Sequence, residues 1–275
     1  MLIGREPKID IADRDRLKQL LAVEPKTEVS ELWMVLIGHG TFDGRDARFN
    51  LRRPDVAAAE LSNWLSPLKR PVAIINCASS SGPYIGRLSG RNRVVVTSTK
   101  SGFEQHYARF GDYLSRAIAN PIAVLDKDGQ TSLLEAWLTA ARKTQEFYRL
   151  EVRLATEHAL LDDNGDAWGS RAEFFRGIRP VRKVAQGSSL DGFRTHQFHI
   201  VLSASEQKMP PELRRRRDEL ELTVIQLRER KDDDSEDEYY TKLETMLVQL
   251  AELYEQMDKQ SSRLIVPAGA EQHPK

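Results

Sequence analysis

The sequence predicts an α/β fold: a three-layer sandwich around a mostly parallel sheet, followed by an antiparallel helical hairpin. Over residues 1–203, strand-like runs alternate with helix-like segments, which is typical of α/β proteins with crossover connections. The apolar runs are continuous, as expected of parallel strands that are buried on both faces. After residue 203 the composition changes to charged, amphipathic helices. The 275 residues are enough for one such domain and an appendage.

Four runs rich in apolar and β-branched residues predict the strands. Three predict buried strands and the last predicts an edge strand: Leu32–Ile37, Pro71–Cys77, Arg93–Thr97 and Gln197–Leu202. A strand–helix–strand crossover places its two strands side by side, or nearly so, in a parallel sheet. We therefore expect the first two runs to be close neighbours.

Four segments between and around these runs predict helices, because apolar residues recur in them near helical spacing. They are Asp10–Ala22, Asp55–Leu65, Glu104–Ile118 and Ser132–Leu150. Asp55 follows Pro54, and an acidic residue in this setting is a typical helix start.

The chain after residue 203 predicts two helices that form an antiparallel hairpin over residues 204–262. Pro210 and Pro211 suit the start of the first helix, and Ser235 with Glu238 resembles a capping box for the second. The apolar stripe over Leu243–Met257 needs a covering surface. We expect the hairpin to pack on the main domain or on a second copy in a homodimer, and residues 263–275 to be disordered.

Composition limits the partners. The 41 basic and 41 acidic residues balance, so no overall field attracts nucleic acid. No run approaches the ~20 apolar residues of a membrane span, and the opening MLIGREPKIDIADRDR lacks the apolar core of a signal peptide. The single cysteine excludes an internal disulfide. We expect no nucleic-acid or membrane partner and, by default, a cytoplasmic location.

His39 is the first candidate for chemistry. It follows the first predicted strand between Gly38 and Gly40, and ligands of open α/β sheets bind beyond the carboxyl ends of the strands. The two glycines let the backbone approach a ligand and leave the Gly40 N–H accessible. The alternative is a histidine that only stabilises a glycine-rich turn.

Cys77 is the second candidate. It ends the strand PVAIINC and precedes the small residues of ASSSG, which leave room around the sulfur. A helix N-terminus or a nearby imidazole would favour the thiolate, the form that attacks a carbonyl carbon. The alternative is a buried cysteine that acts as a small hydrophobe. Since neighbouring strands are ~4.8 Å apart, His39 and Cys77 could reach one reacting carbonyl together.

A histidine–glycine that ends one strand and a cysteine that ends the next resemble the caspase–legumain group of cysteine peptidases. The segments VLIGHGTFDG, INCASSSGP, TSTKSGFEQHYARFGDYLS, LDKDGQTSLLEAW and TEHALLDDNGD are similar to bacterial caspase-like proteins of the legumain-related branch, over roughly residues 8–205. The resemblance implies a caspase-like fold and cleavage of a peptide or protein substrate. It implies His39 as general acid/base, Cys77 as nucleophile, and the Gly40 and Cys77 N–H groups as an oxyanion hole.

The chain also departs from that pattern. Members of the group have a strand before the histidine strand, but the residues before Leu32 predict only a helix, so the first strand is expected to be missing. The residue two before the nucleophile is Ile75 instead of Gln or Glu, so neither Asp nor Asn specificity transfers. Glu104, Asp112 and Arg45 are candidates for lining a pocket, with solvated surface roles as the alternative. These departures leave a second hypothesis open, an inactive caspase-like module that binds partners through its helical hairpin.

Metal and other polar sites are weaker candidates, and no cofactor is predicted. The alternative is calcium at LDKDGQTSLLEAW, where five positions match an EF-hand loop: Asp126, Asp128, Gly129, Ser132 and Glu135. Val124 stands at the first ligand position, and the competing interpretation is a turn that caps the next helix. The acidic turn Asp162–Asp166, the histidines 106, 158, 196 and 199, and the run Arg214–Arg217 are interpreted as structural or solvated.

Overall fold

The computed structural model describes residues 1–4, 11–119, 125–126 and 129–263. Its internal contacts divide the chain into two compact units, Met1–Val201 and Leu202–Lys275. The first unit is the α/β part, and the second is helical.

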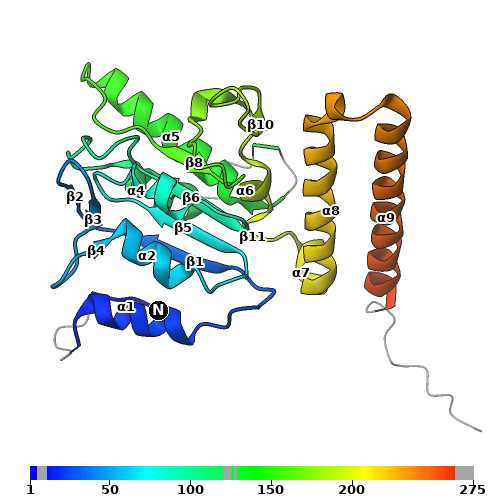
Figure 1. Ribbon diagram of the computed structural model, residues 1–275, viewed down its shortest axis with the longest axis horizontal. Helices are drawn as coiled ribbons and strands as arrows, with labels where there is room; N and C mark the ends of the chain where they lie inside the picture. The colour runs from blue at the N-terminus through cyan, green and yellow to red at the C-terminus, as the bar shows by residue number, and fades with distance from the viewer. Residues whose placement is uncertain (5–10, 120–124, 127–128, 264–275) are drawn as a thin grey trace, which may run out of the picture. The chain divides into compact units, whose positions relative to one another are not determined.

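A four-stranded sheet forms the centre of the first unit (Figure 1). In spatial order its strands are β1 (Leu32–Leu36), β5 (Val72–Asn76), β6 (Arg93–Thr97) and β8 (Leu160–Asp162). The first three are parallel and in register, so the predicted α/β fold with a mostly parallel sheet is confirmed. The prediction that 32–37 is buried on both faces is wrong, because β1 is an edge strand and both Val35 and Ile37 are exposed. Strand β8 pairs antiparallel with β6 and was not predicted, because three residues are too few to show a pattern.

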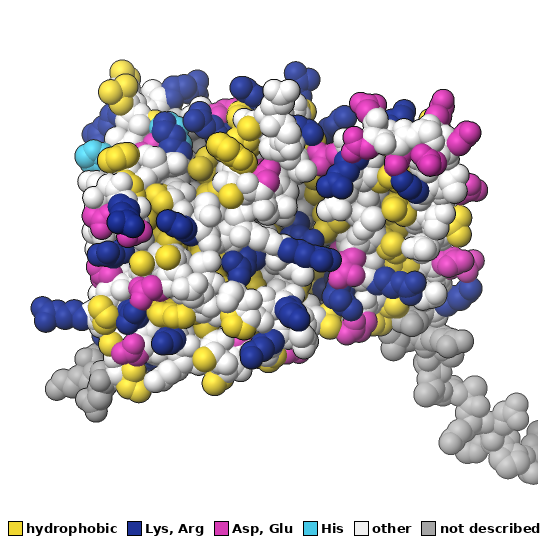
Figure 2. All heavy atoms as spheres, in the orientation of Figure 1, with side chains coloured by type: hydrophobic (Ala, Val, Ile, Leu, Met, Phe, Trp, Pro, Cys, Tyr) yellow, Lys and Arg dark blue, Asp and Glu magenta, His cyan; other side chains and the backbone are white. Residues whose placement is uncertain are grey.

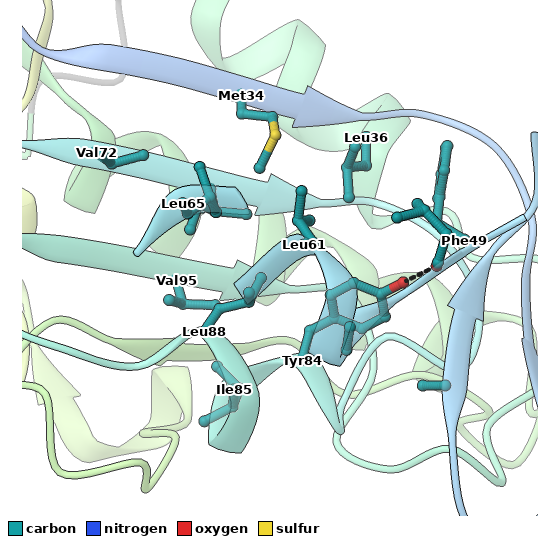
Figure 3. Packing of buried hydrophobic residues seen from close by; sticks show 14 of the residues in the cluster. Met34, Leu36, Phe49, Leu61, Leu65, Val72, Tyr84, Ile85, Leu88 and Val95 are labelled. Atoms are coloured by element: carbon teal, nitrogen blue, oxygen red, sulfur yellow. Dashed lines mark hydrogen bonds between the residues drawn. The ribbon is translucent and has the colours of Figure 1, made fainter. Parts of the chain in front are cut away.

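Helices cover both faces of this sheet and make three layers (Figure 1). One face carries α1 (Asp13–Val23), α2 (Ala58–Leu65) and α3 (Tyr84–Leu88), and the other carries α4 (Phe110–Ala119) and α5 (Leu133–Leu150). Successive side chains of a strand point to opposite faces. Accordingly, Val72 and Ile74 join the first apolar cluster, while Ala73 and Ile75 join the second. Figure 3 shows Leu61 and Leu65 of α2 among the strand residues of the first cluster.

Three helix starts test the sequence predictions. Helix α5 begins where predicted, because Ser132 and Glu135 form a capping box. The segment 104–118 is helical only from Phe110, because the Glu157 carboxylate accepts the N–H groups of Arg109 and Phe110 and sets the start. The segment 55–65 is helical only from Ala58, since the two residues before it form a short strand.

Smaller sheets surround the main one. Strands β2 (Gly40–Phe42), β3 (Ala47–Phe49) and β4 (Val56–Ala57) form an antiparallel three-stranded sheet directly after β1. The predicted edge strand 197–202 is shorter than expected and lies outside the main sheet. Gln197 is the last residue of α6 (Phe193–Gln197), and only β11 (His199–Val201) is a strand, which pairs with β7 (Thr131–Ser132). A 3-10 helix at Ala172–Phe174 precedes β9 (Phe175–Arg176) and β10 (Arg179–Pro180).

The second unit contains α7 (Ala204–Lys208), α8 (Pro211–Glu229), a 3-10 turn at Lys231–Asp233 and α9 (Glu236–Arg263). The capping box predicted for the last helix is present, since Ser235 and Glu238 exchange hydrogen bonds. Apolar side chains are buried in this unit: Leu222, Val224, Tyr239, Leu253 and Met257. The interpretation of Arg214–Arg217 as a solvated face is wrong for Arg217, which is buried and paired with Glu206 and Asp218. The predicted tail lies, from residue 264 on, outside the described residues.

The face shown in Figure 2 carries both acidic and basic side chains, in keeping with their equal numbers in the sequence. Within the described part of the chain, no helix combines the length and the apolar character that a membrane crossing requires.

Candidate active site

His39 lies in the short turn between β1 and β2, beyond the carboxyl end of β1. Its side chain is exposed, and its carbonyl accepts the Asn50 N–H at 2.9 Å. A Cβ at Gly38 would lie 3.0 Å from the Phe49 ring, so a larger residue before the histidine would have to displace that ring slightly. Sequence and packing therefore hold His39 at the same edge of the sheet where the next strand ends.

Cys77 directly follows β5, and its N–H donates to the Leu36 carbonyl at 2.9 Å, which extends the pairing of β1 and β5. The residue is 7% exposed and belongs to the apolar cluster under α4 and α5. A Cβ on Gly111 of α4 would lie 3.3 Å from the Cys77 sulfur, so the helix packs closely over the thiol. Burial raises the pKa of this thiol to about 12. The expectations of open space around the sulfur and of a helix N-terminus that favours the thiolate are therefore wrong, because the residue is buried and the next helix begins only at Tyr84.

The turn after β1 and the loop after β5 are joined through Gly40 and Ser79. The Gly40 N–H donates to Ser79 Oγ at 3.2 Å, and the Ser79 hydroxyl donates to the Gly40 carbonyl at 3.0 Å. A Cβ at Gly40 would lie 2.1 Å from the Ser79 carbonyl oxygen, an impossible contact. The glycine after the histidine is thus required by the backbone that follows the cysteine.

A group of buried hydroxyls fixes the loop after Cys77 to the end of β6. Ser81 Oγ lies 3.1 Å from both Ser98 Oγ and Thr99 Oγ1, and Thr99 Oγ1 also accepts the Gly82 N–H. Ser98 Oγ donates to the Ala78 carbonyl. Because these polar groups are buried and satisfied by one another, they define one arrangement of the loop.

The prediction that His39 and Cys77 follow neighbouring strands is confirmed, since β1 and β5 pair in parallel with Leu36 opposite Asn76. In the described residues, no hydrogen bond joins the His39 ring to the Cys77 sulfur. Both N–H groups assigned to an oxyanion hole are engaged inside the protein, Gly40 with Ser79 and Cys77 with Leu36.

The three candidate pocket residues belong to different segments of the chain. The Glu104 carboxylate accepts the Lys100 N–H and contacts His158 Nδ1 at 2.5 Å. Asp112 pairs with Arg116 along α4, and Arg45 is exposed in the turn between β2 and β3. In the described part of the chain, no hydrogen bond or ion pair joins any two of these three residues.

The residues of the calcium alternative also have structural partners. Glu135 is buried, and its two oxygens accept the Leu125 N–H and the Ser132 N–H. Val124 and Asp128 lie outside the described residues, so the loop as a whole is not described. In the described part of the chain, no group of three or more His, Cys, Asp or Glu side chains is placed to hold a metal ion.

The acidic turn after β8 is bound into the protein. Asp163 accepts the N–H groups of Gly192 and Thr195, and Asp191 accepts the Asp163 N–H and the Ser170 hydroxyl. Burial, and then the charge of Asp163, raise the pKa of Asp191 to about 9. These carboxylates connect β8 to the loop before α6.

No protein-family model matches the chain, and neither does any curated protein or solved structure.

Sequence reasoning missed two residues that shape the candidate site, Ser79 and Gly111. Ser79 stands in a run of small residues, but nothing in the sequence pairs it with Gly40. Gly111 was placed in the middle of a predicted helix, whereas it lies in the first turn of α4, against the thiol. A glycine inside a predicted helix was the available signal of close packing.

Proposed function

We propose that the chain is a caspase- or legumain-like cysteine endopeptidase, with Cys77 as nucleophile and His39 as general acid/base. One observation carries the proposal: the two residues follow neighbouring parallel strands at the carboxyl edge of the sheet. This is the edge where open α/β sheets bind ligands. The paired Gly40 and Ser79 hold the two loops together.

The chemistry follows from the raised pKa of the thiol. A thiol with a pKa of about 12 is scarcely ionised at neutral pH, so a base must take its proton as the sulfur attacks the peptide carbonyl. In the proposed reaction His39 takes that proton and passes it to the leaving amine, which leaves a thioester on Cys77. Water, deprotonated by His39, then hydrolyses the thioester to the acid and the free thiol.

The proposed oxyanion hole requires a rearrangement. The Gly40 N–H would exchange the Ser79 hydroxyl for the substrate oxygen, and the Cys77 N–H would turn from the Leu36 carbonyl. Hydrogen bonds from backbone N–H groups to the developing oxyanion are among the largest contributions to acyl-transfer catalysis.

A second candidate is an inactive caspase-like module that binds partners through its helical second unit. The burial of Cys77 and the engagement of both N–H groups favour it, because a reactive thiol needs access and an unoccupied oxyanion hole. The two proposals differ in whether the thiol reacts with a substrate-like electrophile.

The deciding experiment is labelling of the full chain with a panel of peptide acyloxymethyl ketones, followed by mass spectrometry. The endopeptidase predicts one label on Cys77, none in Cys77→Ala, and labelling slowed about 100-fold in His39→Ala. His106→Ala is the matched control, since His106 is also exposed, and its rate should equal that of the wild type. A folded wild-type chain that no electrophile labels, or a rate unchanged in His39→Ala, would favour the inactive module.

A further inference from the structure

A pocket of about 550 Å³ opens beside α3, in the first unit. Gly82 and Lys100 line one side of it, and they belong to the loops that follow β5 and β6. Trp168 and Arg171, from the segment after β8, and Arg182, which follows β10, line it as well. Gly82 and Lys100 place one part of the pocket near the carboxyl edge of the sheet, on the face that α3 covers, whereas the Cys77 side chain is buried on the opposite face under α4 and α5.

All the charged residues that line the pocket are basic. Lys100, Arg171 and Arg182 line the pocket, and none of the lining residues is acidic. Lys100 is partly neutralised, since its Nζ lies 3.7 Å from Glu104. Among the residues that the structure describes, neither Arg171 nor Arg182 forms an ion pair with a carboxylate. Two guanidinium groups without an acidic partner, facing one cavity, are suited to a carboxylate, which arginine binds through paired N–H donors.

The remaining lining is apolar and suits the body of a ligand. Leu160 and Phe174 form part of the wall, and the Arg182 guanidinium lies 4.7 Å from the centre of the Phe174 ring, which orients it. Trp168 is 56% exposed although large aromatic side chains are usually covered. An exposed indole beside unpaired arginines is typical of a binding surface that stacks on an apolar group next to a charged one.

We propose that this pocket binds an acidic side chain of an extended peptide, together with an apolar neighbour, some residues away from the bond to be cleaved. The inference rests on the proposed endopeptidase function for the identity of the ligand as a substrate. Arg171 and Arg182 hold the carboxylate, and Trp168 and Phe174 contact the apolar neighbour. The proposed preference for acidic substrates comes from this pocket and does not require a polar residue at position 75, two before Cys77.

The test measures binding without chemistry, on the full chain carrying Cys77→Ala. Fluorescein-labelled peptides that contain a Glu–Leu pair are compared with the same peptides carrying Gln–Leu, by fluorescence anisotropy. The acidic peptides are expected to bind about tenfold more tightly or better, and to weaken as salt rises. Arg171→Gln and Arg182→Gln are each expected to weaken the acidic peptides about tenfold and leave the amide peptides unchanged. Trp168→Leu should weaken both sets.

Arg149→Gln is the matched control, because Arg149 is exposed at the end of α5 and does not line the pocket. Inorganic phosphate serves as the free-anion competitor. Equal binding of acidic and amide peptides, arginine variants that behave like Arg149→Gln, or phosphate binding as tight as peptide binding would each overturn the inference. Labelling of Cys77 by peptide electrophiles is measured in a separate experiment. The failure of the pocket proposal and the failure of the endopeptidase proposal can therefore be told apart.

Discussion

Ser79 Oγ lies 3.2 Å from the Gly40 nitrogen and 3.0 Å from the Gly40 carbonyl oxygen, so one hydroxyl bridges both polar groups of a single peptide residue. The contact links the residue after His39 to the loop that begins with Cys77. Any movement that opens the candidate site for an oxyanion must break this contact first. The pair is therefore the contact that holds together the two loops carrying the candidate residues.

We expect Gly40→Ala to destabilise the protein far more than Ser79→Ala. The added Cβ would lie 2.1 Å from the Ser79 carbonyl oxygen, which forces the backbone apart and should cost about 3 kcal/mol. Ser79→Ala removes a hydroxyl and two hydrogen bonds and should cost about 1 kcal/mol. Urea unfolding of both variants measures the difference. Amide hydrogen exchange at Gly40 should be faster in Ser79→Ala than in the wild type. An equal loss of unfolding free energy in the two variants, or unchanged exchange, would contradict the proposed role of this contact.

The buried thiol should respond to pH in a distinctive way. Burial raises the pKa of Cys77 to about 12 from a usual 9.0, so the folded protein holds a neutral thiol where an exposed cysteine is ionised. The alkylation rate by iodoacetamide should keep rising up to the highest pH at which the protein stays folded, without a plateau near pH 9. Stability from this group is present below pH 9 and is lost as pH rises from there toward 12. A plateau near pH 9 in the native chain would show that the thiol is solvated.

Long, regular patterns made much of the fold predictable. Strands β1, β5 and β6 are continuous apolar runs, and α5 carries a local capping box, so both could be recognised within a short window of sequence. The start of α4 could not, because the carboxylate that sets it belongs to Glu157, far along the chain. The small sheet after His39 was also missed, since its strands are two or three residues long.

The candidate site was predictable in position but not in environment. A strand end is visible in the sequence, so the placement of His39 and Cys77 on neighbouring strands could be predicted. The thiol is buried because α4 packs closely against the end of β5. This close approach is possible because Gly111 has no side chain, and the contact between Gly111 and Cys77 forms only in the folded structure. The pocket lined by Arg171 and Arg182 combines loops from four parts of the chain, so no short stretch of sequence predicts it.

Asp191→Asn should stabilise the protein, and more so at higher pH. Burial, and the charge of Asp163, raise the pKa of Asp191 to about 9, above the unfolded value of about 3.9. The stability of such a group is fully present below pH 4 and is lost as pH rises toward 9, because the unfolded chain releases a proton that the folded chain keeps. The amide releases no proton, and its oxygen can still accept the Asp163 N–H.

Thermal unfolding at about pH 4 and about pH 8 measures this effect. The melting temperature of Asp191→Asn should be close to that of the wild type at the lower pH, and higher by on the order of 4 °C or more at the upper one. Asp112→Asn is the control, since Asp112 is exposed beside Arg116. A difference that shrinks between the two pH values would mean that Asp191 is ionised in the folded protein.

Glu157→Ala should loosen the start of α4 and with it the wall that covers the thiol. Its carboxylate accepts the N–H groups of Arg109 and Phe110 and the Tyr148 hydroxyl, and all three would lose their acceptor. We expect a loss of about 3 kcal/mol in the free energy of unfolding, against about 1 kcal/mol for Glu157→Gln, which keeps one acceptor oxygen. Because Gly111 follows Phe110 directly, the alanine variant should also expose Cys77, and its alkylation by iodoacetamide should become faster. An exposed carboxylate on another helix, Glu173→Ala, provides the comparison, and equal stability and equal thiol reactivity in the two variants would exclude Glu157 as the cap of α4.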